Sequence, residues 1–247
     1  MRAAFGLSFF VCDGTVITSV WVRPSRFFVW HRSREGRWVD TGGVVLTVNG
    51  DRGAVERQLG CGELACPACE GVLGGWGNAA KRRVRVLDGP DVVLCPRRSR
   101  CGGCGRTHVL LPAWCLARRA DAGEVIGWAL EVKAAGAGHR VIAGRLGRPA
   151  STVRGWLRAF AARAEQVRWV FTALAAGLVT DPPLPAPAGP GVADAVAAVA
   201  AAAAAAARAV GVVSRWELAA AVTCGLLLAP SWPPRVANMS WLWAAVR

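Results

Sequence analysis

Two closely spaced pairs of cysteines are the residues of this chain best suited to chemistry. Cys66 and Cys69 form one C-x-x-C pair, and Cys101 and Cys104 form a second one. Zinc prefers four soft or borderline ligands in a tetrahedron, and each tight C-x-x-C turn can supply two thiolates. Because four thiolates would close the coordination sphere, we expect one structural Zn²⁺ ion with no open position for a substrate.

Three further side chains near these pairs could compete as ligands. Cys61 and Cys95 each precede a pair by a few residues, and His108 follows the second pair. A cysteine without partner spacing is most often a buried thiol, and a single histidine is most often a surface residue. We therefore interpret Cys61 and Cys95 as core thiols and His108 as a surface residue, which leaves four cysteine ligands.

An arginine-rich segment, residues 139–158, has the pattern of a helix-turn-helix motif. Ala143 is small enough to lie where two helices cross, and Gly147 can adopt the positive φ that a tight turn requires. Val153 and Trp156, three residues apart, would face the first helix of the pair. The segment therefore predicts two short helices joined by a turn at Gly147.

The outward residues of the second helix, which would begin near Ala150, have the chemistry of DNA recognition. Arg154 is the predicted base contact, because a guanidinium group can form two hydrogen bonds with guanine in the major groove. The neighbouring hydroxyls and arginines would reach phosphates. The predicted DNA-binding residues are Arg140, Arg145, Arg148, Ser151, Thr152, Arg154 and Arg158. A plain helical hairpin with incidental charge is the alternative.

The charge of the chain favours a polyanionic partner, and we expect that partner to be double-stranded DNA. Among 247 residues, 30 are basic and 16 are acidic, and the excess is concentrated between residues 81 and 168. Net charge alone does not separate sequence reading from nonspecific adhesion. The basic side chains predicted to hold phosphates near the cysteines are Lys81, Arg82, Arg83, Arg85, Arg97, Arg98 and Arg100.

Strands and helices are predicted around these residues. The strands cover Arg82–Leu87, Val92–Arg98 and Thr107–Leu111, and together with the cysteine pairs they are typical of a zinc ribbon. Three helices are expected between residues 121 and 160. Asp121 and Glu124 fit a capping box for the first of these helices.

The predicted fold class is α+β and multi-module: a small β-rich zinc ribbon, a three-helix helix-turn-helix domain and a helical C-terminal region. The N-terminal part has β-like composition in Val16–Val22, Arg26–Trp30 and Val44–Val48. It is either an appended β-hairpin region or an extension translated from an upstream start codon. The predicted parts are 1–55 as this N-terminal extension, 56–115 as the ribbon, 120–168 as the helix-turn-helix domain, 180–191 as a Pro-rich linker and 192–247 as an Ala-rich helical region.

The Ala-rich segment from Val192 to Val213 is long enough to be weighed as a membrane span. Alanine contributes little transfer free energy, and Asp194 and Arg208 lie inside the segment. We therefore expect a helix outside the membrane, with no membrane partner. The tail, with Trp232 and Trp241–Trp243, could pack back on this helix or mediate self-association.

The cysteine content favours a reducing compartment. Nine cysteines are an odd total, and their C-x-x-C spacing is typical of a metal site instead of a disulfide framework. The apolar start of the chain ends at Asp13 with no cleavage site after it. The predicted location is cytoplasmic.

The acidic residues argue against catalysis by the chain alone. A transposase holds two metal ions with three carboxylates mounted on a sheet. The acidic residues after the arginine-rich segment lie in helical, Pro-rich or Ala-rich sequence. A tyrosine recombinase is excluded, because the chain has no tyrosine. The sequence pairs none of the free cysteines with a histidine and a carboxylate, which a nucleophile site would require. The chain is predicted not to be an enzyme.

The stretch from Gly60 to Phe160 resembles an actinobacterial family of zinc-ribbon/helix-turn-helix proteins. The resemblance lies in CPAC, Trp76-Gly77 followed by KRRVRV, CGGCGRTHVLLP and GHRVIAGRLGRPASTVRGWLR. Members are often transposase-like or associated with insertion sequences. The resemblance implies a DNA-binding regulator or DNA-targeting component of mobile elements, with the four paired cysteines as ligands and the helix from Ala150 as the recognition helix.

Two other functional classes remain open from the sequence. The ribbon and the Trp-rich tail could bind protein, with the helices as support. The ribbon could also bind RNA, with an incidental helical hairpin beside it.

Overall fold

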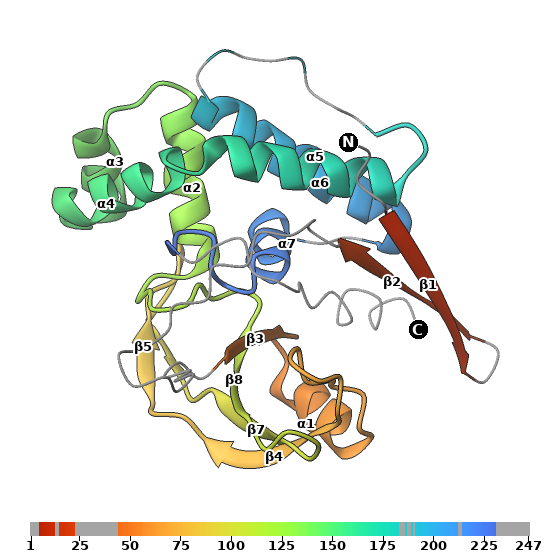
Figure 1. The fold of residues 1–247 in the computed structure, drawn as a ribbon. Helices are drawn as coiled ribbons and strands as arrows, with labels where there is room; N and C mark the ends of the chain where they lie inside the picture. Colours follow the sequence, from red (N-terminus) through yellow and green to blue (C-terminus); the bar gives the residue numbers. More distant parts are fainter. Residues whose placement is uncertain are drawn as a thin grey trace, which may run out of the picture.

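The computed structural model describes residues 5–12, 15–22, 44–182, 186, 189, 191–211 and 214–230. Within these residues the chain forms seven helices, one four-stranded sheet and two separate β-hairpins (Figure 1). This mixture confirms the predicted α+β class. The first hairpin pairs β1 (Phe5–Cys12) with β2 (Thr15–Val22). The Arg26–Trp30 segment and the tryptophans of the predicted tail lie outside the described residues.

The four-stranded sheet consists of β3 (Val44–Val48), β4 (Leu73–Asn78), β7 (Arg97–Cys101) and β8 (Thr107–Pro112). Its strand order is β3–β8–β7–β4, and the cysteine pairs come just before β4 and at the end of β7. β3 runs parallel to β8, and the other two pairings are antiparallel. The sheet therefore begins at Val44, ahead of the boundary at residue 56 that the sequence suggested.

Helix α1 (Arg52–Gly60) connects β3 to the first cysteine pair. Asp51 caps its start, because its carboxylate accepts hydrogen bonds from the backbone N–H groups of Gly53 and Ala54. Val55 and Leu59 on its inner side join a small buried cluster with residues of the sheet and with two of the cysteines. A core of this size stabilises little by itself, so a further crosslink would have a large effect on this part of the fold.

The second hairpin pairs β5 (Arg82–Val84) with β6 (Val92–Leu94) and forms a two-stranded sheet of its own. The sequence predicted a single strand over Val92–Arg98, and this was wrong because the chain leaves β6 at Cys95 and enters β7 only at Arg97. Pro96 lies between the two strands, and proline lacks the N–H that a continuous ladder would need.

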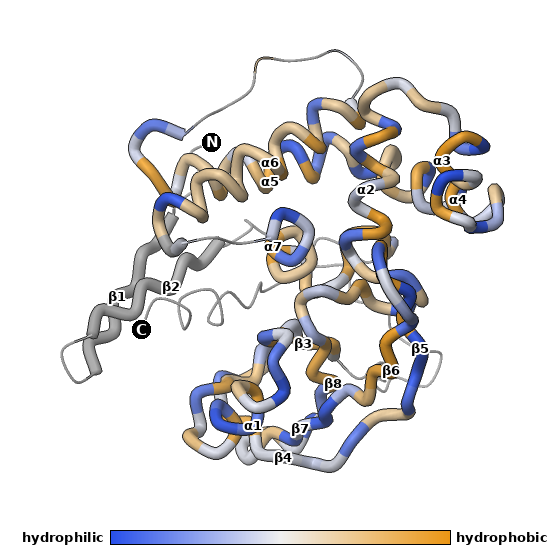
Figure 2. The backbone as a smooth tube through the Cα atoms, turned by 180° about the vertical axis from the view of Figure 1, so that it is seen from behind, coloured by the Kyte–Doolittle hydropathy of each residue, from blue (hydrophilic) through white to orange (hydrophobic). Residues whose placement is uncertain are grey.

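Three helices follow β8, as the sequence predicted, and three more complete the helical part. These are α2 (Gly123–Ala134), α3 (His139–Leu146), α4 (Ala150–Ala161), α5 (Ala164–Leu178), α6 (Gly191–Val210) and α7 (Arg215–Val222). α5 and α6 lie side by side, whereas α3 and α4 project at one end (Figure 1). Figure 2 shows the contrast between the largely apolar pair α5–α6 and the hydrophilic strands β5 and β7.

Alanines make the contact surface of α6. Ala198, Ala202 and Ala205 are fully or almost fully buried, and their small side chains allow neighbouring helices to approach closely. Among the described residues, α6 is long and apolar enough to cross a membrane, and half of its apolar window is buried inside the protein. A helix packed in a protein core meets the same criterion.

The β5–β6 hairpin shares one hydrophobic core with the helices. Val84 and Leu94 from this hairpin belong to the same buried cluster as Ile126 in α2, Phe160 in α4 and Leu227 after α7. The hairpin is thus part of the helical core, although its sequence lies between the two cysteine pairs.

Candidate metal centre and candidate nucleic-acid interface

The structure brings the four paired cysteines together. Their Sγ atoms all lie within 4.8 Å of one another, and Cys66–Cys104 and Cys69–Cys101 are 3.7 and 3.4 Å apart. Tetrahedral zinc with Zn–S bonds of about 2.3 Å separates its sulfurs by about 3.8 Å. The donor set and its spacing therefore fit one zinc ion.

The backbone of each turn directs its sulfurs inward. The Cys66 N–H donates to the Gly71 carbonyl at 2.8 Å, and the Cys104 N–H donates to the Cys101 sulfur at 3.4 Å. A side chain at Gly71 would crowd the cluster, because its Cβ would lie 3.0 Å from the Cys101 sulfur. These contacts fix the two turns so that their thiols face each other.

The sulfurs influence the protonation of one another. The Cys104 N–H is the main cause that lowers the pKa of the Cys101 thiol to about 6. The Gly71 N–H lowers the pKa of Cys69, but the neighbouring sulfurs of Cys104 and Cys101 raise it by more, to about 12. Four thiolates at this spacing therefore need a cation to balance them, which a divalent metal would supply.

His108 is buried beside this cluster, so its interpretation as a surface histidine was wrong. Its side chain is 0% exposed, and its Nε2 atom lies 3.4 Å from the Cys66 sulfur. The alternation of β8 is the cause, since His108 and Leu110 point to the same buried side of the strand. The predicted strand over Thr107–Leu111 places His108 on the same face as Leu110.

Cys61 and Cys95 lie outside the four-sulfur cluster. Cys61 is exposed, so its interpretation as a core thiol was wrong. Cys95 is half-buried, with its sulfur 3.7 Å from the Ala79 carbonyl.

Helices α3 and α4 meet at the turn that the sequence predicted. Gly147 ends α3 in the left-handed conformation, with a φ of 61°, and α4 begins at Ala150. Ala143 is buried where the helices cross, and Val153 and Trp156 are buried on the inner side of α4. The turn therefore rests on a residue type that tolerates positive φ.

The opposite side of α4 is polar and exposed. Ser151, Arg154 and Arg158 follow one another at helical spacing on this side, and all three are exposed. Arg140 and Arg145 on α3 are exposed as well, whereas Thr152 is half-buried. Within the described part of the chain, these four arginines form no ion pair. Their charge is therefore available to an anionic partner.

Arg148 forms an ion pair within the protein. Its Nε atom donates to Asp121 Oδ1 at 2.6 Å, and its side chain is only 16% exposed. Arg85 of the hairpin donates to the other oxygen of the same carboxylate at 3.2 Å. Asp121, which is 3% exposed, therefore connects the β5–β6 hairpin to the turn before α4.

The capping box predicted for Asp121 and Glu124 is wrong. Helix α2 begins at Gly123 with Ala122 as its N-cap, and no side chain caps it. The carboxylate of Asp121 is held by the two arginines, and the backbone pairing of Arg85 with Ala120 and Ala122 fixes its position.

The basic stretch near the cysteines is partly committed to contacts within the protein. Arg97 pairs with Glu56 at 2.9 Å, and Arg82 donates to the Arg119 carbonyl at 3.0 Å. Lys81 and Arg83 are exposed.

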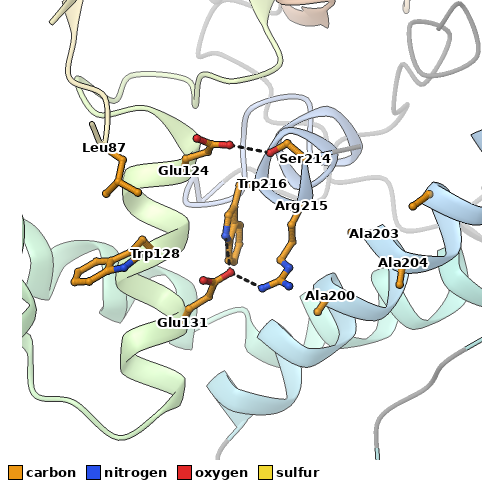
Figure 3. A pocket seen from close by; sticks show the side chains of 11 residues that line it. Leu87, Glu124, Trp128, Glu131, Ala200, Ala203, Ala204, Ser214, Arg215 and Trp216 are labelled. Carbon is orange, nitrogen blue, oxygen red and sulfur yellow. Dashed lines mark hydrogen bonds and ion pairs between the residues drawn. The ribbon is translucent and has the colours of Figure 1, made fainter. Parts of the chain in front are cut away.

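An open pocket of about 640 Å³ lies between α2, α6 and α7, and its polar side chains contact one another (Figure 3). Glu131 accepts hydrogen bonds from Arg215 at 2.5 Å and from the Trp216 indole at 3.0 Å, and Ser214 lies 3.1 Å from Glu124. These contacts hold α7 against α2, so the pocket reflects helix packing.

Comparison of the chain with protein-family models, with curated proteins and with solved structures finds no match.

Proposed function

We propose that this protein binds double-stranded DNA through α3 and α4 as a helix-turn-helix motif. The observation that carries the proposal is the two-sided character of α4. Val153, Trp156 and Phe160 are buried on one side, and Ser151, Arg154 and Arg158 are exposed on the other. A projecting helix with a short polar and arginine-rich outer face suits the width of a major groove.

The roles of the exposed side chains follow from their positions. Arg154, central on the outer face of α4, would pair with a guanine edge through its two-pronged guanidinium group. Ser151 and Arg158 on the same face, and Arg140 and Arg145 on α3, would contact phosphates beside it. Arg148 would act indirectly, because its pair with Asp121 positions the start of α4.

The four clustered cysteines would hold one structural zinc ion in a ribbon. When bound, the ion would crosslink the two turns and contribute on the order of 10 kcal/mol to folding. The backbone amides around the cluster orient the sulfurs, and His108 packs against Cys66.

The proposed biological role is that of a cytoplasmic, non-catalytic regulator or DNA-targeting component of mobile elements. The resemblance over residues 60–160 supports the link to mobile elements. The acidic residues after the arginine-rich segment lie in helical, Pro-rich or Ala-rich sequence, which supports a binding role. Self-association through the C-terminal region is part of the same proposal.

The test is fluorescence anisotropy with labelled duplex DNA and zinc-loaded protein. Arg154→Ala should weaken binding to the preferred duplex roughly 5- to 150-fold, the loss expected for one base contact. Arg168→Ala is the control, because Arg168 is an exposed helical arginine on α5 that pairs with Glu165. If about six to ten phosphates are contacted, affinity should fall by about 10³–10⁵ between about 50 and 200 mM salt.

Two outcomes would contradict the proposal. Equal affinity for duplex DNA in the Arg154 and Arg168 variants would remove α4 as the reading helix. Displacement of duplex DNA by structured RNA at equal concentration would favour the RNA-binding alternative.

A further inference from the structure

A second surface with nucleic-acid chemistry lies on the sheet, at its edge strand β4. Trp76 on this strand is 50% exposed, which is unusual for the largest apolar side chain. The pairing of β4 with β7 is interrupted between Gly75 and Asn78 by a bulge that contains Trp76. Bulges re-aim side chains, and this one presents the indole outward.

The bulge is held in place by specific contacts. Gly77 has a φ of 84°, and its carbonyl accepts a hydrogen bond of 2.7 Å from Arg97. Arg97 also pairs with Glu56, and Asn78 accepts a hydrogen bond from Arg52 at 3.3 Å. α1 therefore supports the bulge from behind, so the exposure of Trp76 is built into the fold.

Beside Trp76 lies an open hollow of about 340 Å³ whose floor consists mainly of glycine. It is lined by Gly74, Gly75, Trp76, Arg100, Cys101, Gly102 and Gly105. At Gly74 and Gly102 a Cβ would meet its nearest atom only at 3.9 and 3.8 Å, so packing does not require glycine there. The lack of side chains at these positions leaves the backbone open to a flat ligand.

Arg100 completes the hollow. Its guanidinium carbon lies over the Trp76 ring, 4.7 Å from the ring centre, a cation–π contact that places a positive charge against one face of the indole. The segment of the chain that contains Arg100, residues 81–106, has eight basic and two acidic side chains, of which Arg82, Arg85 and Arg97 are held by contacts within the protein. A flat aromatic group carried on an anionic backbone would satisfy both the indole and this charge.

We propose that the Trp76–Arg100 hollow binds an unpaired base of single-stranded DNA by stacking on the indole. Base–aromatic stacking next to arginine is the common means of holding single strands, because every base has a π-face. The inference shares with the proposed function only the identity of the partner as DNA. It does not depend on duplex reading by α4, which lies on a different part of the molecule.

The test is binding of a labelled mixed-sequence single-stranded DNA to the full zinc-loaded chain at fixed salt. Trp76→Ala should weaken binding about tenfold, and Trp76→Phe should retain most of the affinity because it keeps an aromatic face. Trp169→Ala is the matched control, since Trp169 on α5 is 55% exposed and lies outside the sheet. Zinc content, measured for each variant, shows that the ribbon is intact.

Two results would overturn the inference. One is the same single-strand affinity in the Trp76→Ala and Trp169→Ala variants. The other is tighter, Trp76-dependent binding of an RNA strand of the same sequence, which would assign the hollow to RNA. Duplex binding separates the two proposals: Trp76→Ala should leave it unchanged and Arg154→Ala should leave single-strand binding unchanged. If Arg154→Ala leaves duplex binding unchanged while Trp76→Ala still weakens single-strand binding, only the duplex-reading proposal is refuted.

Discussion

At the scale of single residues, the clustered cysteines influence the protonation of one another. Four sulfurs within 4.8 Å are stabilised by backbone N–H groups, of which the Cys104 N–H lowers the pKa of Cys101 to about 6. The pKa of Cys69 is raised to about 12 by its sulfur neighbours, so without a cation the cluster keeps protons. Zinc binding should therefore release protons, and its affinity should rise with pH until the thiols have ionised.

Replacement of one ligand tests the metal centre. Cys66→Ser should abolish stoichiometric zinc and destabilise the sheet, because the ion joins two turns around a small core. Cys61→Ser is the matched control, since Cys61 lies five residues away along the chain and is exposed. The measurement is zinc content by mass spectrometry together with thermal unfolding. Equal zinc content in both variants would contradict the assignment of the ligands.

His108 is predicted to position Cys66, because its ring nitrogen lies 3.4 Å from that sulfur in a fully buried site. His108→Ala should lower zinc affinity about 10- to 100-fold, as loss of outer-shell hydrogen bonds does elsewhere. His108→Gln keeps an N–H donor and should restore part of the affinity. The readout is competition with a chromophoric chelator. His139→Ala at the start of α3 serves as the control, and an equal loss there would refute the role.

At the scale of elements, one buried carboxylate joins parts that the sequence keeps separate. Asp121 receives Arg85 from the β5–β6 hairpin and Arg148 from the turn between α3 and α4. Ion pairs with a buried partner contribute strongly only as complete units, because removal of one partner leaves an uncompensated charge. The orientation of α4 therefore depends on the hairpin that the two cysteine pairs enclose in sequence.

Asp121→Asn tests this connection with little change in shape. It should reduce the free energy of unfolding by about 3 kcal/mol, because both arginines lose their counter-charge in a buried site. Glu165→Gln removes the carboxylate of the exposed pair with Arg168 and should change the free energy of unfolding much less, because solvent screens an exposed ion pair. Urea denaturation monitored by circular dichroism gives both values. Similar losses in the two variants would mean that the Asp121 cluster is no more important than a surface pair.

At the scale of the whole molecule, the sequence predicted what depends on local patterns. The turn at Gly147, the start of α4 at Ala150 and the grouping of Cys66 with Cys101 follow from residue type and spacing. The parallel pairing of β3 with β8 depends on contacts far apart in the chain, which no local pattern contains.

The same limit applies to side chains whose roles are set by long-range packing. Asp121 has the local pattern of a helix cap, but Arg85 and Arg148 draw its carboxylate away from α2. The outward position of Trp76 depends on a bulge between two strands separated by the β5–β6 hairpin. In both cases the partners lie nineteen or more residues away along the chain.

The central claim is that α4 reads the sequence of double-stranded DNA. The most direct measurement is selection of duplex fragments from a random pool by the zinc-loaded protein at near-physiological salt, followed by sequencing. We expect a shared motif that loses definition at one or more guanine positions in Arg154→Ala and persists in Arg168→Ala. A bound pool without any shared motif, or one unchanged by Arg154→Ala, would contradict this claim.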